Sequence, residues 1–97
     1  MNDKLINKAE DVSKILRVIS NENRLLIVCF LIDEEKTVTD INRKLPNLSQ
    51  SAVSQHLSIL KASGIVASKK RGMNIFYSIK DERISFLIQF LREKFCE

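Results

Sequence analysis

One stretch in the middle of the 97-residue chain decides the fold: LSQSAVSQHLSILKASG, residues 48–64. Its apolar residues recur at helical spacing and form one stripe: Val53, Leu57 and Leu60. Ser49 is a good N-cap, because its hydroxyl can accept hydrogen bonds from the free amides of the first turn. Gly64 can end the helix, since glycine adopts the left-handed conformation without steric cost. The stretch therefore predicts one helix between these two residues.

The remaining faces of this helix carry small, uncharged hydrogen-bonding side chains. They are Ser49, Gln50, Ser51, Ser54, Gln55, His56 and Ser58. Donors and acceptors concentrated in the first two turns suit the reading of base edges in a DNA major groove. An ordinary amphipathic helix with a solvated face would show the same pattern. This helix alone therefore leaves both interpretations open.

The composition predicts one mainly helical domain over residues 1–97. Hydrophobic residues make up 44% of the chain and charged residues 29%, which is typical of a soluble globular protein rather than a disordered one. Only two glycines and one proline are present, which favours helices over a β-sandwich. The net charge of +4 and the pI of about 9.3 point mildly to a polyanionic partner.

Neither a secretory segment nor a membrane segment is visible in the sequence. The first apolar residues, Leu5 and Ile6, are followed at once by the polar residues Asn7 and Lys8. The longest apolar run, residues 25–32, is far too short to cross a bilayer. We therefore expect a cytoplasmic protein without a membrane partner, whose two cysteines are reduced at rest.

Two helices are predicted near the start of the chain. Residues 3–19 carry an apolar stripe with a period of 3.6, and its width suggests burial against a partner chain. Ser20 can cap a second helix, in which the apolar run 25–32 would lie at the centre of the core. A buried strand is the alternative for so short a run. The polar segments 20–23 and 33–36 on either side favour the helix.

A short third helix precedes the central stretch. Thr37 followed by Asp40 resembles a capping pair. Pro46 disfavours helical geometry in the residue before it, so the helix should close there. Residues 46–48 then form a tight turn into the helix that Ser49 caps. A short helix, a tight turn and a longer polar-faced helix make a helix-turn-helix pattern.

After Gly64 the apolar period changes from 3.6 to 2, which predicts a β-hairpin with strands 65–70 and 74–80 and Gly72 at the reversal. The tip carries three cations: Lys69, Lys70 and Arg71. A basic hairpin beside a base-reading helix suits a wing that holds phosphates. A solvated hairpin whose charges prevent edge pairing is the alternative, and the helix-turn-helix upstream favours the wing.

A last helix follows the hairpin. Asp81 and Glu82 suit its first turn, where negative charge complements the helix dipole. Its main apolar stripe consists of Ile84, Leu87, Ile88, Leu91 and Phe95. Phe86 and Phe90 form a second stripe beside it. Because one small domain can hardly cover both stripes, we expect the aromatic one to make a dimer contact with the first helix.

The predicted fold is mainly α with a β-hairpin, in the order helix-helix-helix-helix-strand-strand-helix: a winged helix-turn-helix that forms a homodimer. At or near base edges and adjacent phosphates we expect Ser49, Gln50, Ser51, Ser54, Gln55 and His56. On phosphates we expect Lys61, Lys69, Lys70 and Arg71. One histidine, no glycine-rich phosphate loop and no nucleophile–base pair argue against an enzyme.

The chain resembles the winged-helix bacterial repressors of the ArsR/SmtB type over nearly its whole length. Four segments carry the resemblance: SNENRLLI at 20–27, SAVSQHL at 51–57, LKASGIV at 60–66 and the hairpin from Gly72 to Ile79. It implies a homodimer, formed by the terminal helices, that binds double-stranded operator DNA and releases it when an effector binds.

Metal sensing, for which this family is known, does not fit the sequence. The third helix, around residues 37–43, has neither cysteine nor histidine, where family members place thiol ligands. The last helix offers Asp81, Glu82 and Glu93 but no histidine. Two cysteines alone do not provide the ligand set of a Zn²⁺ or Cu(I) site. We therefore predict neither a metal nor a cofactor.

The two cysteines are placed as in the dithiol branch of the family, which senses persulfides, related reactive sulfur species or oxidants. Cys29 lies in the second predicted helix and Cys96 at the end of the last one. The resemblance implies that one thiolate attacks an oxidised sulfur species and the other resolves the product. The alternatives are that Cys29 is a small core residue and Cys96 a free thiol. A regulator without a thiol switch and a winged-helix protein-interaction module also stay open.

Overall fold

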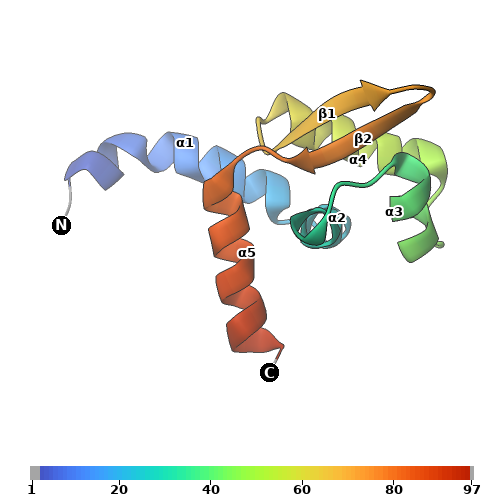
Figure 1. Cartoon of the computed structure of the whole chain (residues 1–97). Coiled ribbons are helices and arrows are strands. Elements are labelled where there is room, and N and C mark those ends of the chain that lie inside the picture. Colours follow the sequence, from blue (N-terminus) through green and yellow to red (C-terminus); the bar gives the residue numbers. More distant parts are fainter. Residues whose placement is uncertain (1–2, 97) are drawn as a thin grey trace.

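A computed structural model describes residues 3–96, and within them the predicted order of elements is confirmed (Figure 1). The elements are α1 (Asp3–Ile19), α2 (Glu22–Asp33), α3 (Val38–Lys44), α4 (Gln50–Ala62), β1 (Val66–Arg71), β2 (Asn74–Ile79) and α5 (Glu82–Phe95). The apolar run 25–32 lies within α2, so it forms a helix and not a buried strand.

Short-range hydrogen bonds set the ends of α3 and α4. Thr37 and Asp40 form a reciprocal capping box at the start of α3, with both side-chain-to-backbone distances at 3.1 Å. The Ser49 hydroxyl accepts from the amide of Ala52 and caps α4. Gly64 follows the last turn with φ of 77°, a conformation that a side chain would disfavour. The caps predicted for these two helices are therefore confirmed.

The predicted cap of α2 is wrong by one residue. Asn21 is the N-cap, and its side chain accepts from the amide of Arg24. Ser20 instead donates its hydroxyl to the carbonyl of Leu16, 2.7 Å away, and so completes the last turn of α1. Both residue types cap helices well, and the register of α1 decides which of them is available.

The two strands pair antiparallel in one hairpin, with Val66 opposite Ile79 and Arg71 opposite Asn74. Each boundary lies within one residue of the prediction. Gly72, at the first central position of the turn, has φ of 60°. A further segment joins the hairpin, because Lys36 and Tyr77 exchange backbone hydrogen bonds of 3.0 and 2.8 Å. The connection between α2 and α3 is therefore attached to β2.

The core lies around α2, which Figure 1 shows nearly end-on below the hairpin and α4. Thirteen buried apolar side chains form one cluster: Ile19, Ile27, Val28, Leu31, Ile41, Leu45, Val53, Leu57, Leu60, Ile65, Val66, Ile84 and Ile88. The predicted stripe of α4 is thus entirely buried. Packing of this stripe on the core leaves the polar face of α4 toward solvent.

Helices α1 and α5 extend away from the body of the subunit in different directions (Figure 1). Large apolar side chains stay exposed on both, namely Leu5, Ile6, Val12 and Leu16 on α1 and Phe86, Phe90 and Phe95 on α5. The sequence places Phe95 in the main apolar stripe of α5, which should face the core; this prediction is wrong, because 81% of the residue's surface is exposed. The helix has extended beyond the core by that turn.

Candidate nucleic-acid interface and thiol pocket

The polar face of α4 is accessible over its first turns. Gln50, Ser51 and Gln55 are exposed, and Ser54 is half-buried. Gln50 donates its side-chain amide to the hydroxyl of Thr39 at 3.2 Å and so ties α4 to α3. The Ser49 hydroxyl serves as the cap and also lies 3.1 Å from that of Ser51. Gln55 makes no side-chain hydrogen bond with any described residue, which leaves its amide available to a partner.

His56 is turned partly into the protein. Its Nδ1 is buried and has no hydrogen-bond partner within residues 3–96. Burial lowers the pKa of His56, and the positive charge of Arg24 on α2 lowers it further. The imidazole is therefore neutral at pH 7, and any contact with DNA would be a neutral hydrogen bond rather than a charge on a phosphate.

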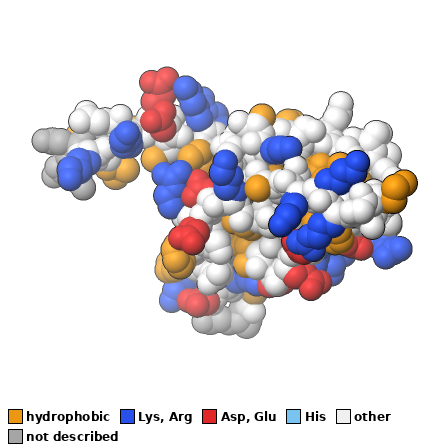
Figure 2. Space-filling model, turned by 45° about the horizontal axis from the view of Figure 1, so that its top comes forward, with side chains coloured by type: hydrophobic (Ala, Val, Ile, Leu, Met, Phe, Trp, Pro, Cys, Tyr) orange, Lys and Arg blue, Asp and Glu red, His pale blue; other side chains and the backbone are white. Residues whose placement is uncertain are grey.

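The cations on the hairpin and on the adjoining end of α4 are all exposed, but they differ in the hydrogen bonds and ion pairs that they make. Figure 2 shows Lys and Arg side chains gathered over this face. Lys69 and Lys70 are exposed and make no ion pair among the described residues. Lys61 donates to the hydroxyl of Ser68 at 2.7 Å and links α4 to β1. Arg71 is ion-paired with Glu35 and lies over the ring of Phe76, 4.8 Å from its centroid.

Replacing Glu35 with glutamine should strengthen DNA binding, because the Glu35 carboxylate competes with phosphate for Arg71. An exposed ion pair of this kind is worth up to about 1 kcal/mol, so affinity should rise by up to roughly fivefold. The rise in affinity should be equal for all DNA sequences. The slope of log affinity against log salt concentration should steepen by the amount expected for about one additional phosphate contact. Titrations at several salt concentrations measure both. Glu10→Gln, which removes the same charge from α1, is the control; an equal gain there would show that only net charge matters.

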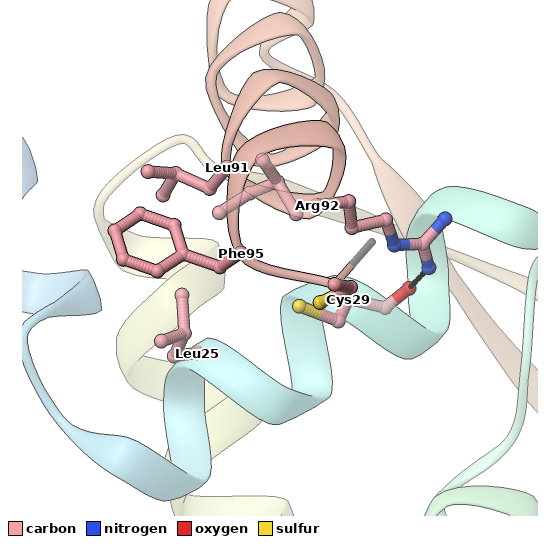
Figure 3. A pocket seen from close by; sticks show the side chains of 7 residues that line it. Leu25, Cys29, Leu91, Arg92 and Phe95 are labelled. Carbon is pink, nitrogen blue, oxygen red and sulfur yellow. Dashed lines mark hydrogen bonds between the residues drawn. The ribbon is translucent and has the colours of Figure 1, made fainter.

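The two cysteines lie at one pocket between α2 and α5 (Figure 3). Its volume is about 300 Å³, and its lining consists of Leu25, Cys29, Ile88, Leu91, Arg92, Phe95 and Cys96. Both thiols are free; Cys29 is half-buried and Cys96 is exposed. The fold thus brings together two residues that are far apart in the sequence.

Arg92 links α5 to α2 through hydrogen bonds beside this pocket. Its guanidinium donates to the carbonyl of Cys29 at 3.0 Å and to both carboxylate oxygens of Asp33, each also at 3.0 Å. This hydrogen-bonded pair lowers the pKa of Asp33 and raises the pKa of Arg92. The sequence gives no sign of this role of Asp33, because a partner 59 positions away leaves no local pattern.

The environment makes the two thiols unequal. Burial raises the pKa of the Cys29 thiol above its ordinary value, and the positive charge of Arg92 offsets this only in part. A thiol with a raised pKa forms less of the reactive thiolate at neutral pH. Cys29 is therefore a poor first nucleophile, whereas Cys96 is open to reagents from solvent.

No group of three or more His, Cys, Asp or Glu side chains is arranged to hold a metal ion in the described part of the chain. Likewise, none of the helices seen between residues 3 and 96 combines the length and apolar character needed to span a bilayer.

Comparison with known proteins identifies the family. Residues 21–68 match the sequence profile described as "Bacterial regulatory protein, arsR family". The chain is also 36% identical over 83 residues to the transcriptional activator HlyU of Vibrio cholerae, a match that covers 86% of this chain and 76% of HlyU. The chain belongs to the ArsR family. This ArsR-family chain is a transcriptional regulator and not an enzyme.

Two further matches extend over nearly the full length. The ArsR-family chain is 34% identical to the HTH-type transcriptional regulator YgaV of Escherichia coli, over 91% of its own length and 89% of YgaV. Its fold superposes on the solved structure of reduced HlyU from Vibrio cholerae with a TM-score of 0.90 at 31% identity. That superposition covers 99% of this chain and all of the other. The winged helix-turn-helix predicted from the sequence is thereby confirmed.

Proposed function

We propose that the chain acts as a single-domain, homodimeric repressor in the cytoplasm, which binds operator DNA and releases it when sulfur chemistry links Cys29 to Cys96. The observation that carries the proposal is the placement of both thiols at one pocket between α2 and α5, in a fold whose α4 face and basic hairpin suit DNA. Reactive sulfur species or oxidants are the proposed inducers.

Dimer formation is supported by the exposed apolar side chains of α1 and α5. Isolated subunits seldom expose so many large apolar residues on neighbouring helices. A winged helix-turn-helix domain from Mycobacterium bovis, Mb0332, with a TM-score of 0.78 to this chain, is homodimeric. A symmetric dimer presents two copies of α4, and these must match half-sites roughly 34 Å apart on the duplex.

The inequality of the thiols suggests an order of steps. The thiolate of the exposed Cys96 attacks a sulfur–sulfur bond of the reactive species first, forms a mixed disulfide or polysulfide at the mouth of the pocket, and displaces a thiolate. Cys29, half-buried beside it, then attacks that product and closes the link. Proximity in one pocket favours this second step over attack by a thiol from solution.

The link would act on DNA binding through α2. This helix contacts α1, α4 and β2, whereas α5 carries part of the proposed dimer interface. A covalent bond between α2 and α5 would fix the angle between the reading helix and the dimer axis. Small changes in that angle alter the separation of the two α4 helices, and paired half-sites tolerate little such change.

Treatment of the reduced protein with an organic persulfide, followed by intact and peptide mass spectrometry, tests the proposal. We expect one product in which Cys29 and Cys96 are joined, together with a large loss of operator affinity that dithiothreitol restores. A product without this cross-link and with unchanged affinity would remove the switch. Affinity that does not depend on salt would remove DNA binding as well and favour a protein-docking role.

Raised pH should accelerate closure of the link. Burial raises the pKa of Cys29 above the ordinary 9.0. Its thiolate fraction should therefore still increase at pH values where an unperturbed cysteine is already fully ionised. Stopped-flow measurement of the rate of the second step against pH should show that this rate rises at higher pH than for an unperturbed cysteine. Arg92→Gln should displace this rise further upward, since it removes the one positive charge that opposes the effect. A profile equal to that of a free thiol would contradict the assignment.

A regulator that activates transcription, by displacing a repressor, is the second candidate. It is favoured by the similarity to HlyU, which is a transcriptional activator, whereas a relative from Xylella fastidiosa at 30% identity is a biofilm growth-associated repressor. A reporter assay in cells with and without the gene distinguishes the two, because only a repressor gives higher expression when deleted.

A further inference from the structure

We propose that the pocket between α2 and α5 selects its sulfur donor by charge, so that uncharged organic polysulfides react in preference to anionic ones. This inference rests on the proposed thiol switch and names the class of reagent that operates it.

Apolar side chains form the walls that an entering reagent would contact. They are Leu25, Ile88, Leu91 and Phe95. Figure 3 shows Leu25, Leu91 and Phe95 grouped on one side of the pocket, with the sulfur of Cys29 directed toward that side. An alkyl group next to the reacting sulfur would therefore replace water against these walls.

Among the described residues that line the pocket, only Arg92 is charged, and it does not supply a free cation. The guanidinium of Arg92 points away from the apolar group, toward the carbonyl of Cys29 (Figure 3). Both carboxylate oxygens of Asp33 accept from it as well. Asp33 therefore offsets part of this positive charge and holds the guanidinium away from the apolar walls, so a carboxylate on an entering reagent would lose hydration and gain only a weakened attraction to Arg92.

The pocket is open to solvent and has room for a small substituent next to the reacting sulfur. A volume of about 300 Å³ lies at the lower end of the range found for small-molecule sites. This space suits a short sulfur chain with alkyl groups of a few carbons.

The reaction with a dialkyl trisulfide balances without another reactant. The thiolate of Cys96 attacks the central sulfur, one sulfur–sulfur bond breaks, and an alkyl thiolate leaves. The Cys29 thiolate then attacks the same sulfur, and the second alkyl thiolate leaves. The two cysteines are oxidised by two electrons in total and become joined through one inserted sulfur atom. The trisulfide is reduced to two alkyl thiolates, and solvent takes the protons from both cysteines.

Long-range electrostatics would produce the opposite preference. The chain carries a net charge of +4, which favours the approach of anions. A preference for uncharged reagents would therefore come from the pocket and not from the charge of the whole protein.

Three trisulfides of similar length test the proposal on the reduced, full-length protein. They are dipropyl trisulfide, bis(2-carboxyethyl) trisulfide and the dimethyl ester of the latter. For each trisulfide, the rate of cross-link formation in the protein is divided by the rate at which the same trisulfide reacts with an uncharged free thiol, N-acetylcysteine methyl ester. This ratio removes differences in the intrinsic reactivity of the three reagents. We expect the dipropyl and ester reagents to exceed the dicarboxylate by about tenfold or more in this ratio. Equal ratios, or a faster dicarboxylate, would overturn selection by charge while leaving the switch intact. No cross-link with any reagent would overturn the switch too.

A charge placed in the pocket provides the matched variant. Leu91→Lys should reduce the preference by about fivefold or more, because it gives a carboxylate a partner inside the pocket. Ser58→Lys adds the same charge on the exposed surface of α4 and should leave the preference unchanged. An equal response of both variants would contradict the pocket as its origin. If circular dichroism shows Leu91→Lys to be unfolded, the ratios for the unsubstituted protein still decide the question.

Discussion

Replacing Cys96 with serine should abolish release from operator DNA by reactive sulfur while leaving DNA binding itself unchanged. Cys96 is exposed, and the end of α5 lies far from α4 (Figure 1), so loss of this thiol should not disturb the polar face of α4. Without it, only the half-buried Cys29 remains, and its raised pKa makes it slow to react. Operator titrations before and after persulfide treatment should be superimposable for this variant.

The complementary variant Cys29→Ser separates the order of the two steps. It should still form a mixed disulfide or polysulfide on Cys96 at nearly the rate of the unsubstituted protein, yet form no internal link. Mass spectrometry with time resolution distinguishes this from Cys96→Ser, in which the first modification is itself slow. Faster modification of Cys29 than of Cys96 would reverse the proposed order. Release of DNA by Cys29→Ser would show that the cross-link is unnecessary.

Replacing Gln55 with glutamate should nearly eliminate operator binding. The amide of Gln55 is exposed and unengaged on the polar face of α4. Gln55→Ala should cost about 1–3 kcal/mol at its base pair and relax sequence preference there. Glutamate adds repulsion from the phosphates of about 1–4 kcal/mol at close range. The combined loss should reach about 100-fold or more, measurable by fluorescence anisotropy with a labelled operator.

Gln89→Glu is the matched control for Gln55→Glu, because it adds the same negative charge elsewhere on the surface. Gln89 is also exposed, but it lies on α5, where its side chain donates to Ser85. The control should change affinity only slightly. An equal loss in both variants would indicate that net charge, and not contact by α4, causes the effect. Undiminished binding by Gln55→Glu would place the DNA on another face.

Local signals explain why most of the fold could be predicted from the sequence. The box formed by Thr37 and Asp40, the Ser49 cap and the positive φ of Gly64 all depend on neighbours within four positions. Ser20 and Asn21 show the limit of such signals, because two adjacent residues can both serve as caps and only the packing of α1 decides between them.

Contacts between distant segments could not be predicted in the same way. Asp33 and Arg92 are 59 positions apart, and Glu35 and Arg71 are 36 apart. An isolated acidic or basic residue gives no sign of which partner the fold will bring to it. For this reason the sequence predicts an Arg71 that is free to bind phosphate and does not predict the ion pair between Arg92 and Asp33 beside the thiols. Exposure of Phe95 likewise depends on where the core ends, which periodicity alone does not show.

The backbone bonds between Lys36 and Tyr77 make the segment after α2 behave mechanically as a third, very short strand. Because these bonds join the segment to β2, a tilt of the hairpin should also move this segment and the first turn of α3. The position of the wing therefore depends on a segment about forty residues upstream as well as on the hairpin's own turn.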